Sequence, residues 1–281
     1  MSKVTRREFL GGVAGVGVAT ALPARAQVSA TKPLKRVLAI GDVQTGYQHD
    51  SVSHALATME RLGRATGTYA MTIRTDSQLL TKHEVKEARN VKNLNAFDAV
   101  FFFGVGEGSL SEQQKTDLLS FVHDDGKGFV GAHTGIDAFE SWPEYGEMIG
   151  GYFDNHPWGV TDGTVLVERP EFPGWSGLGS KFAIREEFYQ NKAPYDRSRQ
   201  DVIARLDVSK LDMTVKNVNR KDGDYPVAWA KSYGKGRVFW STFGHAEEAW
   251  DDPRVQGVYM GALRWALGLE AYTPKPHALP R

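Results

Sequence analysis

The first half of the chain alternates between short apolar runs and stretches in which apolar residues recur at helical spacing. Apolar runs of this length are typical of strands, and the continuous ones are typical of strands buried on both faces. They cover Arg36–Gly41, Tyr69–Arg74, Asn95–Gly104 and Gly128–His133. Because strands and helices alternate, we expect parallel strands joined by right-handed crossovers, and therefore a three-layer α/β sheet.

Two stretches between these runs carry signals for the start of a helix. Asp50 or Ser51 can cap a helix that extends to about Leu62. Ser111, with Gln114 three residues later, matches a capping box and opens an amphipathic helix. Both helices are expected to cover a face of the sheet.

The second half of the chain changes to short alternating strands followed by one closing helix. The expected strands are Gly163–Glu168, Phe182–Tyr189, Val202–Leu206, Val227–Ala230 and Tyr233–Gly244, and the helix covers Pro253–Leu267. Neither a repeat nor a linker rich in proline, glycine or serine separates the two halves. We therefore predict one domain over residues 36–270, whose later strands extend or flank the parallel sheet, and a C-terminal tail over residues 271–281.

Residues 1–26 have the parts of an export signal. Arg6 and Arg7 precede a weakly apolar run, which is shorter than the ~20 residues that span a bilayer, and Ala24–Ala26 resembles a cleavage site. We predict a twin-arginine-type signal peptide over 1–26 and a short linker over 27–35, with an uncleaved membrane anchor as the alternative. The mature protein is then periplasmic or secreted, without stable membrane insertion after export.

The composition excludes several classes of function. The chain has 281 residues with 34 basic and 34 acidic side chains, so its charge gives no reason to expect nucleic acid as a partner. It has no cysteine, which excludes disulfides, cysteine-ligated zinc, iron–sulfur clusters and cysteine nucleophiles. The glycines of Gly104–Gly108 lack the third glycine of a dinucleotide-binding loop, so they do not indicate a nucleotide cofactor.

Four histidines lie where binding groups concentrate. His49, His133, His156 and His245 each follow an expected strand or lie in a loop bounded by glycine or proline. Because the carboxyl ends of parallel strands meet at one edge of a sheet, we expect these imidazoles to converge there. Three other histidines fall in stretches that we expect to be helical and exposed to solvent: His54, His83 and His123.

The segment Gly131–Gly135 places His133 between small residues at the end of a strand. This arrangement permits the sharp turn of a nucleophile elbow, where serine or cysteine normally stands. An imidazole, with its ordinary pKa near 6.5, suits proton transfer or metal ligation. The alternative is a hydrogen-bonded capping histidine with a structural role.

A carboxylate and a phenol are further candidates. Alternation along the strand places Glu187 and Tyr189 on one face and Glu186 on the other, although an ordinary solvated strand face would show the same pattern. Asp137 follows the elbow by four residues and comes within reach of it if a helix starts there. Trp158 can offer a stacking surface to a sugar ring, or it can be a large core residue.

These segments together resemble the ThuA-like family of trehalose-utilisation proteins, which have the flavodoxin-like fold of class I glutamine amidotransferases. The resemblance extends from about Arg36 to Gly268, and its most specific part is Gly150–Pro157. It is also carried by Gly131–Asp137, Trp142–Trp158, Glu186–Gln190, Pro226–Trp229, Tyr233–His245 and Trp250–Pro253. The chain departs from the family at Ile136, where a polar residue is common.

The resemblance implies a mostly parallel three-layer sheet and a role in carbohydrate metabolism, because members are associated with disaccharides oxidised to 3-keto sugars. It does not imply glutaminase activity, because His133 stands where the amidotransferases carry cysteine. We favour an exported hydrolase, lyase or isomerase that acts on a sugar or keto-sugar. The alternatives are a non-catalytic carbohydrate-binding protein and a partner-binding protein on the same fold.

The enzyme hypothesis assigns roles to eight residues. The catalytic residues are predicted to be His133, Glu187, Asp137 and His245, and the substrate-binding residues His49, His156, Trp158 and Tyr189. Three imidazoles and a carboxylate suit a divalent metal such as zinc, with His133, His156, His245 and Glu187 as the expected ligands. The expected partner is a small carbohydrate, and a homo-oligomer is compatible with the sequence.

Overall fold

The computed structural model describes residues 33–43, 45–86 and 88–280. The predicted signal peptide and most of the predicted linker lie outside these residues. Within them, no helix is both long and apolar enough to cross a membrane. The folded domain begins at Leu34.

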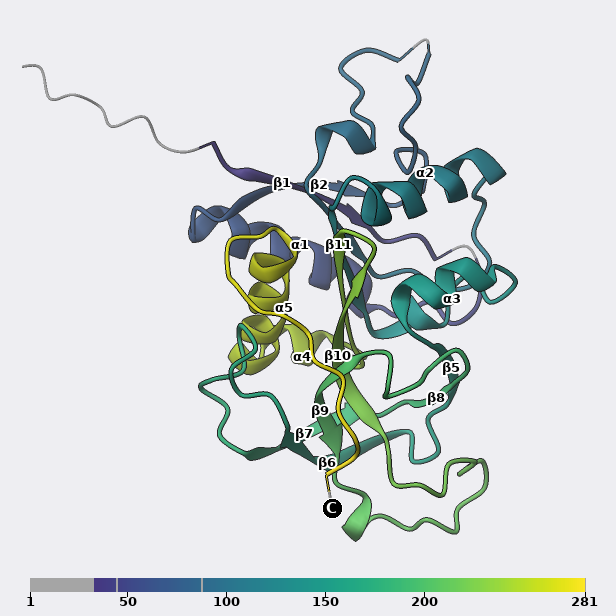
Figure 1. The fold of residues 1–281 in the computed structure, drawn as a ribbon, viewed down its shortest axis with the longest axis vertical. Coiled ribbons are helices and arrows are strands. Elements are labelled where there is room, and N and C mark those ends of the chain that lie inside the picture. The colour runs from purple at the N-terminus through teal and green to yellow at the C-terminus, as the bar shows by residue number, and fades with distance from the viewer. Residues whose placement is uncertain (1–32, 44, 87, 281) are drawn as a thin grey trace, which may run out of the picture. The chain divides into compact units, whose positions relative to one another are not determined.

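A nine-stranded sheet forms the centre of the domain, in the order β2-β1-β3-β4-β11-β10-β9-β6-β7 (Figure 1). The strands are β1 (Lys35–Ile40), β2 (Tyr69–Arg74), β3 (Ala99–Phe102), β4 (Gly128–Ala132), β6 (Val160–Val167), β7 (Lys181–Glu187), β9 (Asp201–Leu206), β10 (Pro226–Tyr233) and β11 (Gly236–Ser241). A separate two-stranded sheet pairs β5 (Tyr152–Asn155) with β8 (Gln190–Lys192).

The sheet has a parallel half and an antiparallel half. The five strands from β2 to β11 are parallel, in the order 2-1-3-4-11, which corresponds to the flavodoxin-like order. The pairs from β11 to β7 are all antiparallel. Because four antiparallel steps reverse the direction four times, β7 runs in the same direction as β4 and β11. All three strands therefore end at the same edge of the sheet.

Helices cover both faces of the parallel half, which gives the predicted three layers (Figure 1). The helices α1 (Ser51–Ala65), α4 (Glu247–Asp251) and α5 (Pro253–Ala266) pack on one face, and α2 (Glu112–His123) and α3 (Pro143–Ile149) pack on the other. Alternate residues of β1 enter the two cores: Val37 and Ala39 contact one, and Leu38 and Ile40 the other. The apolar character of these strands follows from burial on both faces.

The observed elements confirm the predicted fold class and correct several predicted boundaries. The third strand starts only at Ala99, because Asn93 caps a short 3-10 helix over Leu94–Ala96. The predicted strand Phe182–Tyr189 corresponds to β7, which ends at Glu187, and β8 begins only at Gln190 in a different sheet. His83 lies outside any helix, contrary to the prediction. The capping box of Ser111 and Gln114 is present at the start of α2.

Candidate functional site

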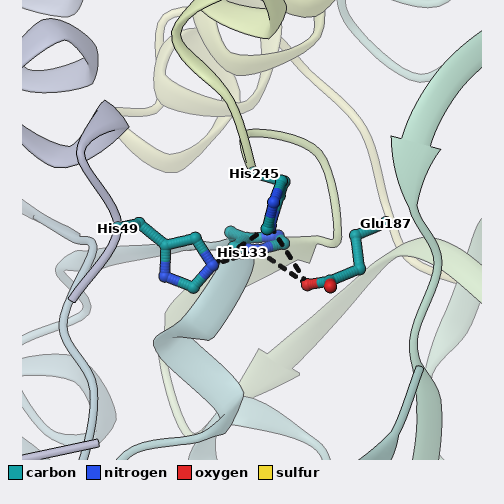
Figure 2. A group of neighbouring side chains, drawn as sticks. All are labelled: His49, His133, Glu187 and His245. Carbon is teal, nitrogen blue, oxygen red and sulfur yellow. Dashed lines mark hydrogen bonds and ion pairs between the residues drawn. The ribbon is translucent and has the colours of Figure 1, made fainter. Parts of the chain in front are cut away.

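Three imidazoles and a carboxylate meet at the edge of the sheet where β4, β7 and β11 end (Figure 2). His49 comes from the loop before α1, His133 directly follows β4, Glu187 ends β7, and His245 lies between β11 and α4. Each offers one donor atom, and these four atoms all lie within 4.8 Å of one another. The four side chains point toward a common centre, although they span most of the domain's sequence.

The backbone turns sharply at His133, as the sequence predicts. Its φ of 45° lies in the left-handed region, which a residue other than glycine rarely adopts. A 3-10 helix, η2 (His133–Ile136), begins at this residue. The indole of Trp240 donates a hydrogen bond to the carbonyl of His133 at 2.9 Å, and Tyr145 Oη donates to the carbonyl of Gly135 at 2.6 Å. These buried bonds hold the turn in its unusual conformation.

The His133 ring is fully buried and has one orientation. Its Nδ1 lies 2.5 Å from the carbonyl oxygen of Thr242, and because a carbonyl only accepts, Nδ1 carries the proton. The lone pair of the neutral ring is then on Nε2, which accepts a hydrogen bond from Tyr189 Oη at 2.8 Å. In metal sites, a backbone carbonyl commonly accepts a hydrogen bond from one ring nitrogen of a histidine. The other ring nitrogen is then oriented to bind the metal.

His49 lies between the other two imidazoles. Its Nε2 is 3.2 Å from His133 Nε2 and 3.2 Å from His245 Nδ1. Burial, followed by the nearby His133 and His245, lowers the pKa of His49 to about 3. The ring is therefore neutral near pH 7, which is the form that binds a metal.

Glu187 supplies the negative charge of the group. Its Oε2 lies 3.2 Å from His245 Nδ1 and 3.5 Å from His133 Nε2. Burial alone would raise the pKa of Glu187, but the adjacent His133 and His245 rings outweigh it and hold that pKa well below its usual range. The bond to Glu187 in turn raises the pKa of His245. The carboxylate is thus ionised and aimed at the imidazoles.

Glu186, the neighbour of Glu187, is buried and accepts three hydrogen bonds from backbone N–H groups. Its Oε1 accepts from Gly244 at 2.8 Å, and its Oε2 accepts from Glu187 at 2.9 Å and from His245 at 3.4 Å. Burial raises the pKa of Glu186. Alternation along the strand predicts that this residue lies on the opposite face from Glu187, and its sequence position indicates no role.

Two other predicted site residues lie at the edge of the four-residue group. His156 Nδ1 is 3.4 Å from Glu187 Oε1, but the imidazole is 44% exposed. Asp137 follows η2, and within the described residues its carboxylate makes no hydrogen bond to the histidines. Burial, with the nearby Glu140, raises the pKa of Asp137 to about 6. Both lie at the border of the group rather than inside it.

The structure places Trp158 away from the histidines. Its ring packs on Tyr225, with 5.3 Å between ring centroids, and its Nε1 donates a hydrogen bond to the carbonyl of Asp212 at 3.0 Å. An exposed aromatic ring beside the site is that of Tyr47, which is 69% exposed and lies edge-on to His49 at 4.7 Å. Tyr47, His49 and His245 line a hollow of about 240 Å³. No sequence signal distinguished Tyr47 from other tyrosines.

Comparison with known families adds one match that covers most of the chain. The ThuA family model, described as trehalose utilisation, matches residues 36–266. A search of curated proteins finds no match.

Several solved structures share the fold. A ThuA-like protein of Bacteroides uniformis has a TM-score of 0.69 and 20% sequence identity, over 88% of this chain and 95% of that one. A ThuA-like protein of Parabacteroides merdae has a TM-score of 0.64 and 18% identity, over 89% and 94%. A cytoplasmic protein of Salmonella typhimurium has a TM-score of 0.53 and 13% identity, over 83% and 99%. At these identities, the likeness concerns the fold.

Proposed function

The chain belongs to the ThuA family, and from this premise we propose that it is an enzyme that acts on a sugar or a 3-keto-glycoside with the help of a divalent metal. The observation that carries the proposal is the convergence of His49, His133, His245 and Glu187. Near pH 7 a buried carboxylate facing imidazole lone pairs has the charge and the donor types that a divalent cation needs.

The residues present fit such an ion. Nitrogen and carboxylate donors suit zinc and related transition metals, and the carbonyl of Thr242 holds His133 in the tautomer that puts the lone pair on Nε2, toward the other donors. His49 would therefore be a ligand rather than a substrate-binding group. His156, exposed and in contact with Glu187 alone among the four, would lie outside the ligand set.

A bound divalent ion would supply Lewis-acid polarisation of a substrate carbonyl or hydroxyl. The chain's own groups would move the proton. A 3-keto group acidifies the neighbouring C–H, and a base positioned at the border of the site can abstract that proton. Asp137, with its pKa raised to about 6, and the exposed His156 are the candidates. Tyr189 Oη is a phenol that burial keeps protonated, and once His133 Nε2 ligates an ion, the phenol proton is released from that nitrogen for donation to a substrate oxygen.

The proposal includes the place of action. Arg6, Arg7 and the cleavage-like Ala24–Ala26 support export to the periplasm or beyond. The family supports a small carbohydrate as the partner. Fractionation of cells that express the full chain, with and without the Arg6→Lys and Arg7→Lys changes, tests the export.

Metal analysis followed by a turnover assay tests the activity. The full chain is purified without added metal, analysed for bound transition metals, and incubated with 3-keto-trehalose and 3-keto-glucosides. We expect about one metal per chain, product release, and loss of both in His245→Ala but not in His54→Ala, an exposed histidine of α1. Sugar binding without conversion would instead support a carbohydrate-binding protein, and the absence of both would contradict the proposal.

A further inference from the structure

The loop that carries His245 and the strand that carries Glu187 are joined through one side chain that the proposed chemistry does not use. Glu186 is 2% exposed, and the donors at its oxygens are backbone N–H groups. Among the described residues no Lys, Arg or His side chain pairs with it. A buried carboxylate without a cationic partner is costly, so its retention calls for a specific contribution.

We propose that Glu186 is a positioning residue of the candidate metal centre, which sets the spacing between Glu187 and His245. This inference rests on the proposed function. One Glu186 oxygen accepts from Gly244 N–H, the residue before His245, and the other accepts from the N–H groups of Glu187 and His245. The carboxylate therefore ties the end of β7 to the loop after β11, two segments that are not neighbouring strands in the sheet.

Two further hydrogen bonds fix the end of β7 and the loop after β11. Together with the Glu186 bonds they form a larger set, which we call the clamp. Ser51 Oγ donates to the carbonyl of Gly244 at 2.8 Å, and Thr242 Oγ1 donates to the carbonyl of Glu187 at 2.9 Å. These two bonds use carbonyl groups, whereas Glu186 satisfies the N–H groups. Together, the carbonyl bonds and the Glu186 bonds orient the backbone at the two candidate ligands Glu187 and His245.

The required side chain is one in which both polar atoms accept hydrogen bonds. Glutamine has nearly the same shape, but its NH₂ group is a donor and would face an N–H group in either orientation. Glu186→Gln therefore breaks at least one bond of the clamp while it preserves the volume. Glu186→Asp keeps two accepting oxygens but shortens their reach, so it is expected to have a smaller effect.

The experiment uses Co²⁺ as the probe and the full-length protein. Wild type, Glu186→Gln and Glu186→Asp are titrated with Co²⁺, and the dissociation constant and the visible d–d spectrum are recorded beside urea unfolding curves. Loss of a residue that supports metal ligands typically weakens metal affinity by about 10–100-fold. We expect a loss in this range and an altered spectrum for Glu186→Gln, and a smaller loss for Glu186→Asp.

Glu168→Gln is the matched control. Glu168 is also buried, with 5% side-chain exposure, but it bonds to Arg197, Arg205 and His277. It directly follows β6, which runs opposite to β7 and so ends at the other edge of the sheet. Glu168→Gln should lower stability and leave the Co²⁺ affinity and spectrum unchanged.

Three results would overturn the inference. A Glu186→Gln protein that is less stable but has the wild-type Co²⁺ affinity and spectrum would show that Glu186 is merely structural, while the metal centre stands. If that variant does not fold, wild-type Co²⁺ binding by Glu186→Asp would have the same meaning. Failure of the wild-type chain to bind Co²⁺ or Zn²⁺ would contradict the metal centre itself, and the positioning role with it.

Discussion

Two buried polar clusters lie at opposite edges of the same sheet, and they balance charge in different ways. At the edge after β6, Glu168 pairs with Arg197, Arg205 and His277, and Arg197 also pairs with Asp224 at 3.0 Å. Each carboxylate of this arginine–carboxylate network has a cation within the protein. The network is therefore complete without any other molecule.

The histidine cluster at the other edge balances its charge differently. Among the described residues, Glu187 forms ion pairs with imidazoles alone, and Glu186 has only backbone donors. One of the neighbouring imidazoles, His49, is neutral near pH 7. Burial and polarity alone therefore do not indicate function. Convergence of metal-binding donor atoms on one point does.

The largest expected effect is a loss of stability when the arginine–carboxylate network is broken. Arg197→Met removes a buried cation that Glu168 and Asp224 share, and should lower the free energy of unfolding by up to about 3 kcal/mol, because only part of each charge remains paired. Urea unfolding measures it, and the metal affinity should not change. Arg199→Met removes an exposed partner of Glu147 and should cost less than about 1 kcal/mol. Equal losses for the two variants would refute the distinction.

A substitution in the histidine cluster should instead weaken metal binding and leave the fold intact. His245→Ala removes a half-buried donor, and its effect on metal affinity should exceed the ~100-fold upper range of a supporting residue. Isothermal titration with Zn²⁺ measures this loss, with His54→Ala as the control. Wild-type affinity in His245→Ala would exclude the residue from the ligand set.

A smaller effect is expected at the rim. Tyr47→Ala removes the exposed ring beside His49 and should raise KM for a sugar substrate by up to about tenfold, because one aromatic contact is worth about 0.5–1.5 kcal/mol. Tyr47→Phe keeps the ring and should retain most of the affinity. An unchanged KM in Tyr47→Ala would place the sugar elsewhere.

The smallest effect concerns pH and lies outside both clusters. Burial opposes ionisation of Asp98, but bonds from the Arg36 N–H and the Lys127 ammonium outweigh it and lower its pKa below the usual 3.8. Its contribution is present above that usual value and is lost as the pH falls through the lowered one. Asp98→Asn should therefore cost up to about 1 kcal/mol near pH 7 and progressively less as the pH falls through the lowered pKa, as measured by urea unfolding.

The sequence predicted the features that depend on local pattern. Buried strands such as Arg36–Gly41 show continuous apolar runs, and the parallel arrangement follows from their alternation with helices. The turn at His133 was predictable because small residues flank it. The convergence of His49, His133 and His245 followed from a general rule, that ligand-binding loops lie at the carboxyl ends of strands.

Other features depended on tertiary packing that no local pattern encodes. Whether Trp158 meets the histidines or Tyr225 depends on the path of a long connection. The position of His49 among the donors, in place of His156, depends on how the loop before α1 folds across the sheet edge. Glu186 was assigned to the opposite face by simple alternation, and its bonds appear only when the loop after β11 is in place.

The distance along the polypeptide between His49 and His245 is 196 positions, yet their ring nitrogens lie 3.2 Å apart. An ion held by both would act as a cross-link that closes a very large loop, and the free energy of its binding would favour the whole native domain over the unfolded chain. Because contacts of such separation form late, ion uptake would report that nearly the entire domain had already folded. Removal of the ion by a chelator would accordingly lower the melting temperature of the domain as a unit.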